Sequence, residues 1–134
     1  MNFVVFNIYH TPRTSINDSI PVEHSRVTYS RIDDAVGLIL RSRVGSCLAK
    51  TDIESAFRII SIRPADYNLL GIYWWGDYYF DRCLPVGLAS SCKTFEALST
   101  AVQWISQTKL GICFMLHLLD DFLIISGSHE QCSR

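Results

Sequence analysis

The chain has 134 residues, enough for one domain with a buried core. About half of its residues are apolar (49%) and 19% are charged, a composition typical of globular rather than disordered proteins. The 12 Lys and Arg residues balance 13 Asp and Glu residues, which excludes a general electrostatic attraction to nucleic acid, so such binding would need local basic patches or further segments.

The first part of the chain predicts a strand, an irregular stretch and a helix. The residues up to Val5 form a candidate strand, and residues 11–29 are rich in Pro, Ser, Asn and Asp, which indicates an irregular connection. A helix is predicted over about residues 34–41, capped by Ser30 or Asp33. Its inner side is expected to carry four apolar residues: Ala35, Val36, Ile39 and Leu40.

The middle of the chain predicts a strand, a helical turn and a hairpin. Residues 46–51 form a short buried strand that ends at Asp52, and residues 54–58 follow as a helical turn. Residues 69–74 and 78–83 are rich in aromatic and branched side chains and flank a turn that contains Gly, as in a β-hairpin. The tryptophans are interpreted as packing residues rather than base-stacking platforms: Trp74, Trp75 and Trp104.

The last part predicts a long helix and a second hairpin. The helix is expected over residues 90–107, where apolar residues recur at helical spacing: Phe95, Leu98, Val102 and Ile105. Residues 112–118 and 122–126 form the strands of the hairpin. The order of strand, helix, hairpin, helix and hairpin predicts an α+β fold in which one antiparallel sheet is backed by helices.

Cysteine usage and hydropathy indicate an intracellular protein. The five cysteines include no Cys-x-x-C pair and their number is odd, so we expect reduced, buried thiols in the cytoplasm or nucleus. The hydrophobic N-terminus lacks a basic start, so no signal peptide is predicted and secretion is not expected. The apolar residues 110–125 fall short of the roughly 20 that a membrane span needs and include two aspartates, so no membrane is expected as a partner.

Three aspartates follow or interrupt apolar strands. Asp120 and Asp121 are adjacent, so they repel each other and lose hydration if buried unless a cation or donor compensates. A turn between two strands would place both at a hairpin tip, and Asp52 ends another strand. An isolated Asp-Asp pair is more often a solvated turn. Three carboxylates at strand ends nevertheless favour a site for hard divalent cations such as Mg²⁺.

Three segments resemble the palm motifs of reverse transcriptases. Residues 50–57 (Lys-Thr-Asp-Ile-Glu-Ser-Ala-Phe) are similar to the first motif, and residues 84–88 (Leu-Pro-Val-Gly-Leu), which lead into a helix, are similar to the second. Residues 118–121 (Leu-Leu-Asp-Asp) resemble the third, normally Tyr-x-Asp-Asp. The resemblance is to retrotransposons of the tyrosine-recombinase (DIRS-like) group and covers about residues 16–126.

The resemblance implies a polymerase palm with a ferredoxin-like or RRM-like core and the activity of an RNA-directed DNA polymerase. Two ions, Mg²⁺ or Mn²⁺, about 4 Å apart would activate the primer 3′-hydroxyl and hold the triphosphate of the dNTP. The family assigns Asp52 and Asp120 to both metals, with Asp121 beside them as an auxiliary acid.

The resemblance also implies a nucleotide pocket. Phe57, five residues after Asp52, would stack under the incoming sugar and exclude a 2′-hydroxyl, although burial preference alone would make it a core residue. Val86 and Gly87 would line the pocket, with Gly87 letting backbone approach the nucleotide; as an alternative, Gly87 serves only a turn.

We therefore expect a single partial reverse transcriptase domain over residues 1–134. Residues 1–30 would be a remnant of the fingers, residues 31–126 the palm core and residues 127–134 a tail, with incomplete fingers and no thumb. The implied partners are an RNA or DNA template-primer, dNTP, and the missing fingers, thumb and RNase H parts of a larger polyprotein. Because the palm would expose apolar surface, self-association is also expected.

The alternative hypothesis is a catalytically inactive retroelement remnant that folds or binds a partner without polymerising. Leu118 stands where the third motif normally has Tyr, and Val86 is smaller than the residue that usually follows the Pro of the second motif. The near-neutral charge also favours this alternative.

Overall fold

The computed structural model describes residues 15–127, so the strand expected up to Val5 and nearly all of the expected tail lie outside the described residues. The chain divides into two compact units. We call one the three-stranded unit and the other the hairpin unit. Within the described range, the three-stranded unit contains residues 27–54 and 94–127, and the hairpin unit contains residues 15–26 and 55–93.

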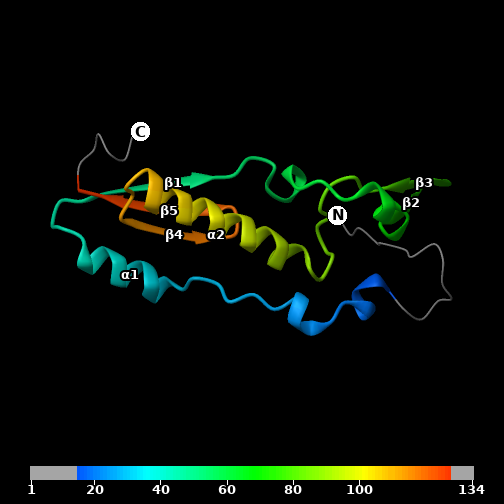
Figure 1. Cartoon of the computed structure of the whole chain (residues 1–134), viewed down its shortest axis with the longest axis horizontal. Helices are drawn as coiled ribbons and strands as arrows, with labels where there is room; N and C mark the ends of the chain where they lie inside the picture. The colour runs from blue at the N-terminus through cyan, green and yellow to red at the C-terminus, as the bar shows by residue number, and fades with distance from the viewer. Residues whose placement is uncertain (1–14, 128–134) are drawn as a thin grey trace. The chain divides into compact units, whose positions relative to one another are not determined.

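An antiparallel sheet forms the centre of the three-stranded unit (Figure 1). Its strands are β1 (Cys47–Asp52), β4 (Phe114–Leu118) and β5 (Asp121–Ser126), in the order β1-β5-β4. Apolar and branched residues dominate the two strands of the β4–β5 hairpin, as suits a pleated surface that is covered by helices. All three strands were predicted from the sequence, within two residues at each end.

The two faces of this sheet are covered by different helices. Side chains alternate along a strand, so His117 and Leu116 of β4 point to opposite faces. His117 contacts Glu96 and Gln103 of α2 (Ser91–Lys109), whereas Leu116 lines a hollow together with Ile32 at the start of α1 (Ile32–Arg41). The sheet of this unit is therefore backed by helices, as predicted.

Helix α1 begins earlier than predicted and buries a different side. Its N-cap is Arg31, whose backbone N–H donates to the Asp34 carboxylate at 2.7 Å, so neither predicted cap residue is used. Leu38 is its buried residue at 8% exposure, and Ala35 is half-buried. The predicted inner side is wrong for three residues, which are exposed: Val36, Ile39 and Leu40. The apolar residues of this helix form one broad side, and Leu38 lies at an edge of it, so tertiary packing decides which part of that side is covered.

Helix α2 follows its predicted course, and Phe95 is fully buried at 0% exposure. The buried stripe continues through Ser99 and Ser106 rather than through Ile105, which is exposed, so the prediction for Ile105 is wrong. Small side chains allow a helix to lie close to its neighbours, and the Ser99 hydroxyl is satisfied by the Phe95 carbonyl at 3.3 Å.

The hairpin unit contains a two-stranded antiparallel sheet of β2 (Gly71–Trp74) and β3 (Asp77–Phe80). Trp75 and Gly76 join the strands with φ of 54° and 92°, the left-handed pair that suits a two-residue hairpin turn. Four short 3₁₀ helices complete the described part of this unit: Ile16–Ser19, Val22–His24, Ala56–Ile59 and Pro64–Leu69.

The single sheet predicted from the sequence is therefore wrong, because the described strands form two separate sheets. The turn residues of a hairpin determine its local pairing but carry no information about which other strands it joins. The α+β class with antiparallel sheets and helices is confirmed.

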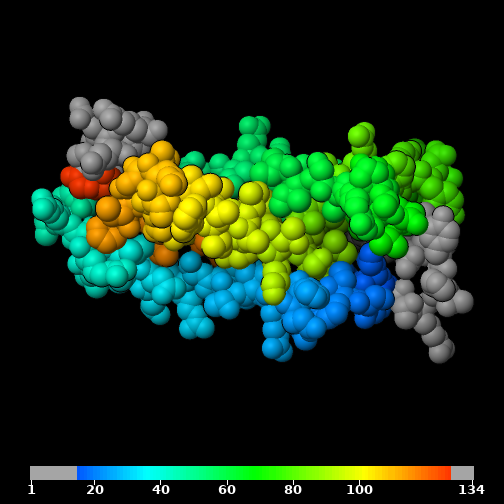
Figure 2. Space-filling view, in the orientation of Figure 1, coloured from blue at the N-terminus to red at the C-terminus, as the bar shows by residue number. Residues whose placement is uncertain are grey.

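The aromatic residues of the β2–β3 hairpin are exposed. The surface of this hairpin is green in Figure 2. Trp75 at the turn is 88% exposed, and Trp74 is also largely open to solvent. Trp104, on the outer side of α2, is exposed as well. The interpretation of these three tryptophans as packing residues is wrong.

Cys47, Cys83, Cys92 and Cys113 are free thiols, which agrees with the expected reduced state. None of them is fully buried, contrary to the expectation, and Cys132 lies outside the described residues.

Candidate carboxylate site

The three predicted aspartates lie at one end of the three-stranded sheet. Asp52 is the last residue of β1 and Asp121 is the first residue of β5, and the two are direct partners in the antiparallel register. Asp120 stands in the turn between β4 and β5, and its carbonyl accepts a hydrogen bond from the Ile53 N–H at 3.0 Å. That bond continues the β1–β5 pairing into the turn, so the sheet itself holds the three residues together.

The turn that carries Asp120 contains one unfavourable backbone conformation. Leu118 pairs with Asp121, which leaves Leu119 and Asp120 as the connection. Leu119 has φ of 54°, a left-handed value that costs a residue with a Cβ about 1–2 kcal/mol. A tight connection between β4 and β5 therefore imposes strain next to the two adjacent carboxylates.

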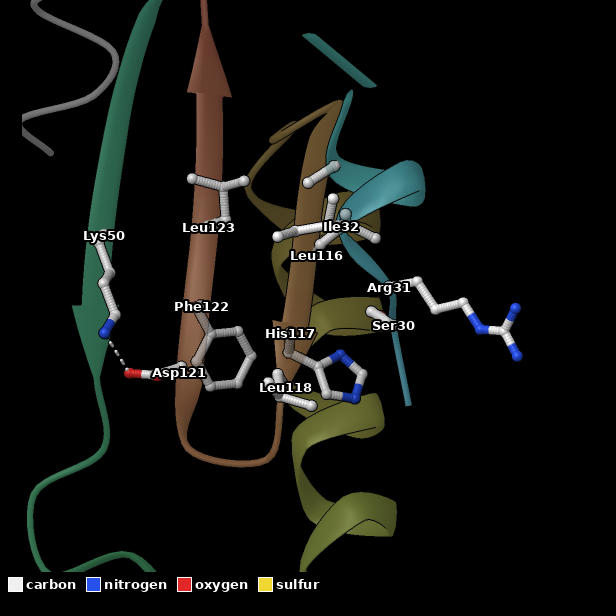
Figure 3. A pocket seen from close by; sticks show the side chains of 11 residues that line it. Ser30, Arg31, Ile32, Lys50, Leu116, His117, Leu118, Asp121, Phe122 and Leu123 are labelled. Atoms are coloured by element: carbon white, nitrogen blue, oxygen red, sulfur yellow. Dashed lines mark ion pairs between the residues drawn. The ribbon is translucent and has the colours of Figure 1, made fainter. Parts of the chain in front are cut away.

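Lys50 supplies a positive charge to this end of the sheet. It lies two residues before Asp52 on β1, and its Nζ is 2.9 Å from Oδ1 of Asp121 (Figure 3). A hydrogen bond and the charge of Asp121 raise the pKa of Lys50, with smaller contributions from the charges of Asp52 and Asp120. Lys50 thus interacts electrostatically with all three carboxylates.

The oxygen donors of this site suit hard cations, and the register places two carboxylates directly opposite each other. Like charges in such a cross-strand pair are destabilising unless a cation lies between or beside them. The residues therefore fit a divalent ion in donor type. Within residues 15–127, however, no group of three His, Cys, Asp or Glu side chains is already arranged to hold a metal.

A hollow of 230 Å³ adjoins Lys50 and Asp121 on the same face of the sheet (Figure 3). Its floor is formed by apolar side chains of β4 and β5, among them Leu116 and Leu123. The segment that leads into α1 forms another wall, and in Figure 3 the side chain of Arg31 points away from the strands. The carboxylate end of the sheet is thus bordered by an apolar recess.

The opposite face carries a buried polar cluster that sequence reasoning missed. His117, placed correctly on a strand, has its Nε2 3.0 Å from Oε1 of Glu96, and its Nδ1 contacts Gln103. The other Glu96 oxygen, Oε2, is buried and has no hydrogen-bond partner in the described part of the chain. The seven-residue spacing of Glu96 and Gln103 along α2, together with one apolar-strand histidine, is the signal that could have suggested this cluster.

Phe57, predicted to touch the nucleotide sugar, lies in the hairpin unit. It is half-buried in the 3₁₀ helix Ala56–Ile59, which begins after a left-handed Ser55 with φ of 61°. The carboxylates belong to the three-stranded unit, so Phe57 and the aspartates are described within separate units.

Val86 and Gly87 also lie in the hairpin unit, in a turn before α2. Val86 is exposed, and Gly87 has φ of 99°, which requires glycine although an added Cβ would meet nothing within 4 Å. The Asn17 side chain fixes the turn: its Nδ2 donates to the Gly87 carbonyl at 2.9 Å, and its Oδ1 accepts from the Ala89 N–H at 2.8 Å. The role of Asn17 was not predicted.

Two arginines of the hairpin unit, which the sequence offers as phosphate ligands but favours as exposed surface charges, are in ion pairs. Arg58 makes two hydrogen bonds of 2.7 Å to Asp81, and Arg63 pairs with Asp66 at 3.0 Å. Arg58 and Arg63 are exposed, as is Lys50, for which the sequence also favours a surface charge; Lys50 in addition pairs with Asp121.

No family model matches the chain, and no curated protein matches it. None of the helices within residues 15–127 is both long enough and apolar enough to span a membrane.

Proposed function

We propose that this chain is the palm part of a retroelement reverse transcriptase, an RNA-directed DNA polymerase. Asp52, Asp120 and Asp121 would hold two Mg²⁺ or Mn²⁺ ions. The observation that carries the proposal is the register of the sheet: Asp52 stands opposite Asp121, and Asp120 is hydrogen-bonded through its carbonyl to the residue after Asp52.

The bound ions would activate the primer 3′-hydroxyl and neutralise the charge of the dNTP triphosphate. The residues of the chain would bind these ions and hold the three carboxylates in position. The pairing of β1 with β5 fixes the positions of Asp52 and Asp121. Asp120 comes directly before Asp121, in the turn that joins β4 to β5. A sheet end is a rigid support, and rigidity matters because nucleotidyl transfer depends on positioning.

In this proposal Phe57 packs against the deoxyribose and discriminates against a 2′-hydroxyl. The exposed Val86 contacts the nucleotide, and the left-handed Gly87, anchored by Asn17, permits close backbone approach. Template-primer and the fingers, thumb and RNase H parts of a larger polyprotein would supply the remaining contacts. The protein would act inside the cell, in the cytoplasm or nucleus.

One observation favours an inactive remnant as a second candidate. Lys50 already neutralises Asp121, and no three-ligand group is assembled within residues 15–127. A remnant of this kind would keep the fold or bind a partner without polymerising DNA.

Binding of Mn²⁺, measured by calorimetry, and primer extension together separate the two candidates, because an inactive remnant extends no primer whether or not it binds metal. If the chain is a polymerase palm with an intact metal site, Mn²⁺ binding should be lost in Asp52→Asn and Asp120→Asn. It should be retained in Asp77→Asn, which makes the same charge change in the hairpin unit. Primer extension with dNTP and with rNTP then tests the activity, supplied with the remaining polymerase parts where the chain alone is inactive. Extension that persists after Asp52→Ala would refute the assignment of the site.

A further inference from the structure

We propose that Lys50 is a built-in counter-ion of the carboxylate site, which holds Asp121 in the metal-free protein and is displaced when a divalent cation binds. This inference rests on the proposed function and adds a residue that regulates the affinity of its metal site. The Lys50 ammonium group would bind the Asp121 carboxylate reversibly, and the metal ion would compete with it for that carboxylate.

The position of Lys50 follows from the register of the sheet. Lys50 is opposite Leu123, and Asp52 is opposite Asp121, so residues 50 and 52 share one face with residues 121 and 123. From this place Lys50 reaches diagonally to Asp121, and Nζ lies 2.9 Å from Oδ1 (Figure 3). A direct hydrogen-bonded ion pair therefore occupies a carboxylate oxygen that a metal would need.

The charges make joint occupation unfavourable. An ammonium and a divalent cation bound to one carboxylate would lie only a few Å apart, and like charges repel at that distance even in water. The Lys50 side chain is 67% exposed and that of Asp121 is 44% exposed, so the lysine can move into solvent. Because exposed ion pairs are weak, the pair can hold Asp121 without preventing metal binding.

This arrangement has a consequence for the three carboxylates. Without metal, Asp52 and Asp121 face each other as like charges, and Lys50 reduces that repulsion. With metal, the lysine is released beside the site. The chain thus keeps the end of the sheet ordered in both states, at the expense of a weaker apparent metal affinity.

The test compares Mn²⁺ binding by four forms of the whole chain, using calorimetry: the wild type, Lys50→Met, Lys50→Arg and Arg63→Met. Arg63→Met is the matched control because it also removes one positive charge from an exposed ion pair, with Asp66 in the hairpin unit. We expect Lys50→Met to bind Mn²⁺ about tenfold more tightly, because a competing cation has been removed. Lys50→Arg and Arg63→Met should bind as the wild type does.

The outcomes separate this inference from the proposed function. If the wild type binds Mn²⁺ through Asp52 but Lys50→Met binds with equal or lower affinity, the counter-ion role is refuted and the metal site stands. If neither the wild type nor Lys50→Met binds Mn²⁺, the proposed function is refuted, and the inference that rests on it falls as well. Tighter binding in both Lys50→Met and Arg63→Met would show a general charge effect and would also refute the role of Lys50.

Discussion

Removing the charge of Asp52 should stabilise the metal-free protein. Asp52 and Asp121 are direct cross-strand partners, and like charges in that position destabilise a sheet by about 0.2–1 kcal/mol. Lys50 is paired with Asp121 and offsets part of this repulsion, so a gain of about 0.5 kcal/mol is expected for Asp52→Asn. For a chain of 134 residues, that gain corresponds to an increase in Tm of about 2 °C.

Thermal unfolding followed by circular dichroism, in buffer that contains a chelator, measures this gain. The matched control is Asp77→Asn, which removes a negative charge from the exposed start of β3. Adding Mg²⁺ should then make the Tm of the wild type higher than that of Asp52→Asn. The reason is that a ligand at ten times its Kd stabilises the protein that binds it by about 1.4 kcal/mol. A lower Tm for metal-free Asp52→Asn, or a gain that Asp77→Asn matches, would refute the electrostatic reasoning.

Three further predictions concern the scaffold of the site. Phe95→Ala should lower the free energy of unfolding by about 3–5 kcal/mol in urea titrations, because Phe95 is fully buried. Ile105→Ala should lower it much less, because Ile105 is exposed. Similar losses in the two variants would contradict the observed buried face of α2. Leu119→Gly should raise that free energy by about 1 kcal/mol by removing left-handed strain, and an unchanged or lower value would argue against the strain. The hydrogen bond from Arg63 lowers the pKa of the Asp66 carboxyl from its ordinary value of 3.8, which an NMR titration would measure. The stabilising ion pair is therefore present above pH 3.8 and is lost as the pH falls through the lowered pKa. An Arg63→Gln variant that leaves the pKa of Asp66 unchanged would exclude this cause.

Local sequence signals predicted most of the secondary structure. The strand before Asp52 and both hairpins were found because short apolar or aromatic runs flank turn residues, and such signals act over a few neighbours. The buried side of α1 was predicted wrongly because the apolar side of this helix is broad, and the burial of Leu38 at its edge depends on what packs against it. The exposure of Trp75 was missed for the same reason: hydrophobicity predicts a preference for burial but names no partner.

The candidate site was predictable in part. Strand ends and an Asp-Asp turn were sufficient to predict that Asp52, Asp120 and Asp121 gather, and the register agrees for Asp52 and Asp121. Lys50 was interpreted as a surface charge and is exposed, but its pairing with Asp121 was missed, although its spacing of two residues from Asp52 on a strand places both on one face. Its partner could not be found without the β1–β5 register, because a shift of one residue would move Asp121 to the other face.

The most direct test of the account is to map Mn²⁺ on the chain by paramagnetic broadening of backbone amide signals in NMR. A metal held by Asp52, Asp120 and Asp121 predicts broadening at the end of β1 and in the β4–β5 turn, at the lowest Mn²⁺ concentrations. The same titration of Asp120→Asn should lose this effect. Broadening that is absent from these residues, or that is unchanged by the substitution, would contradict the proposal that the three aspartates form the metal site of a polymerase palm.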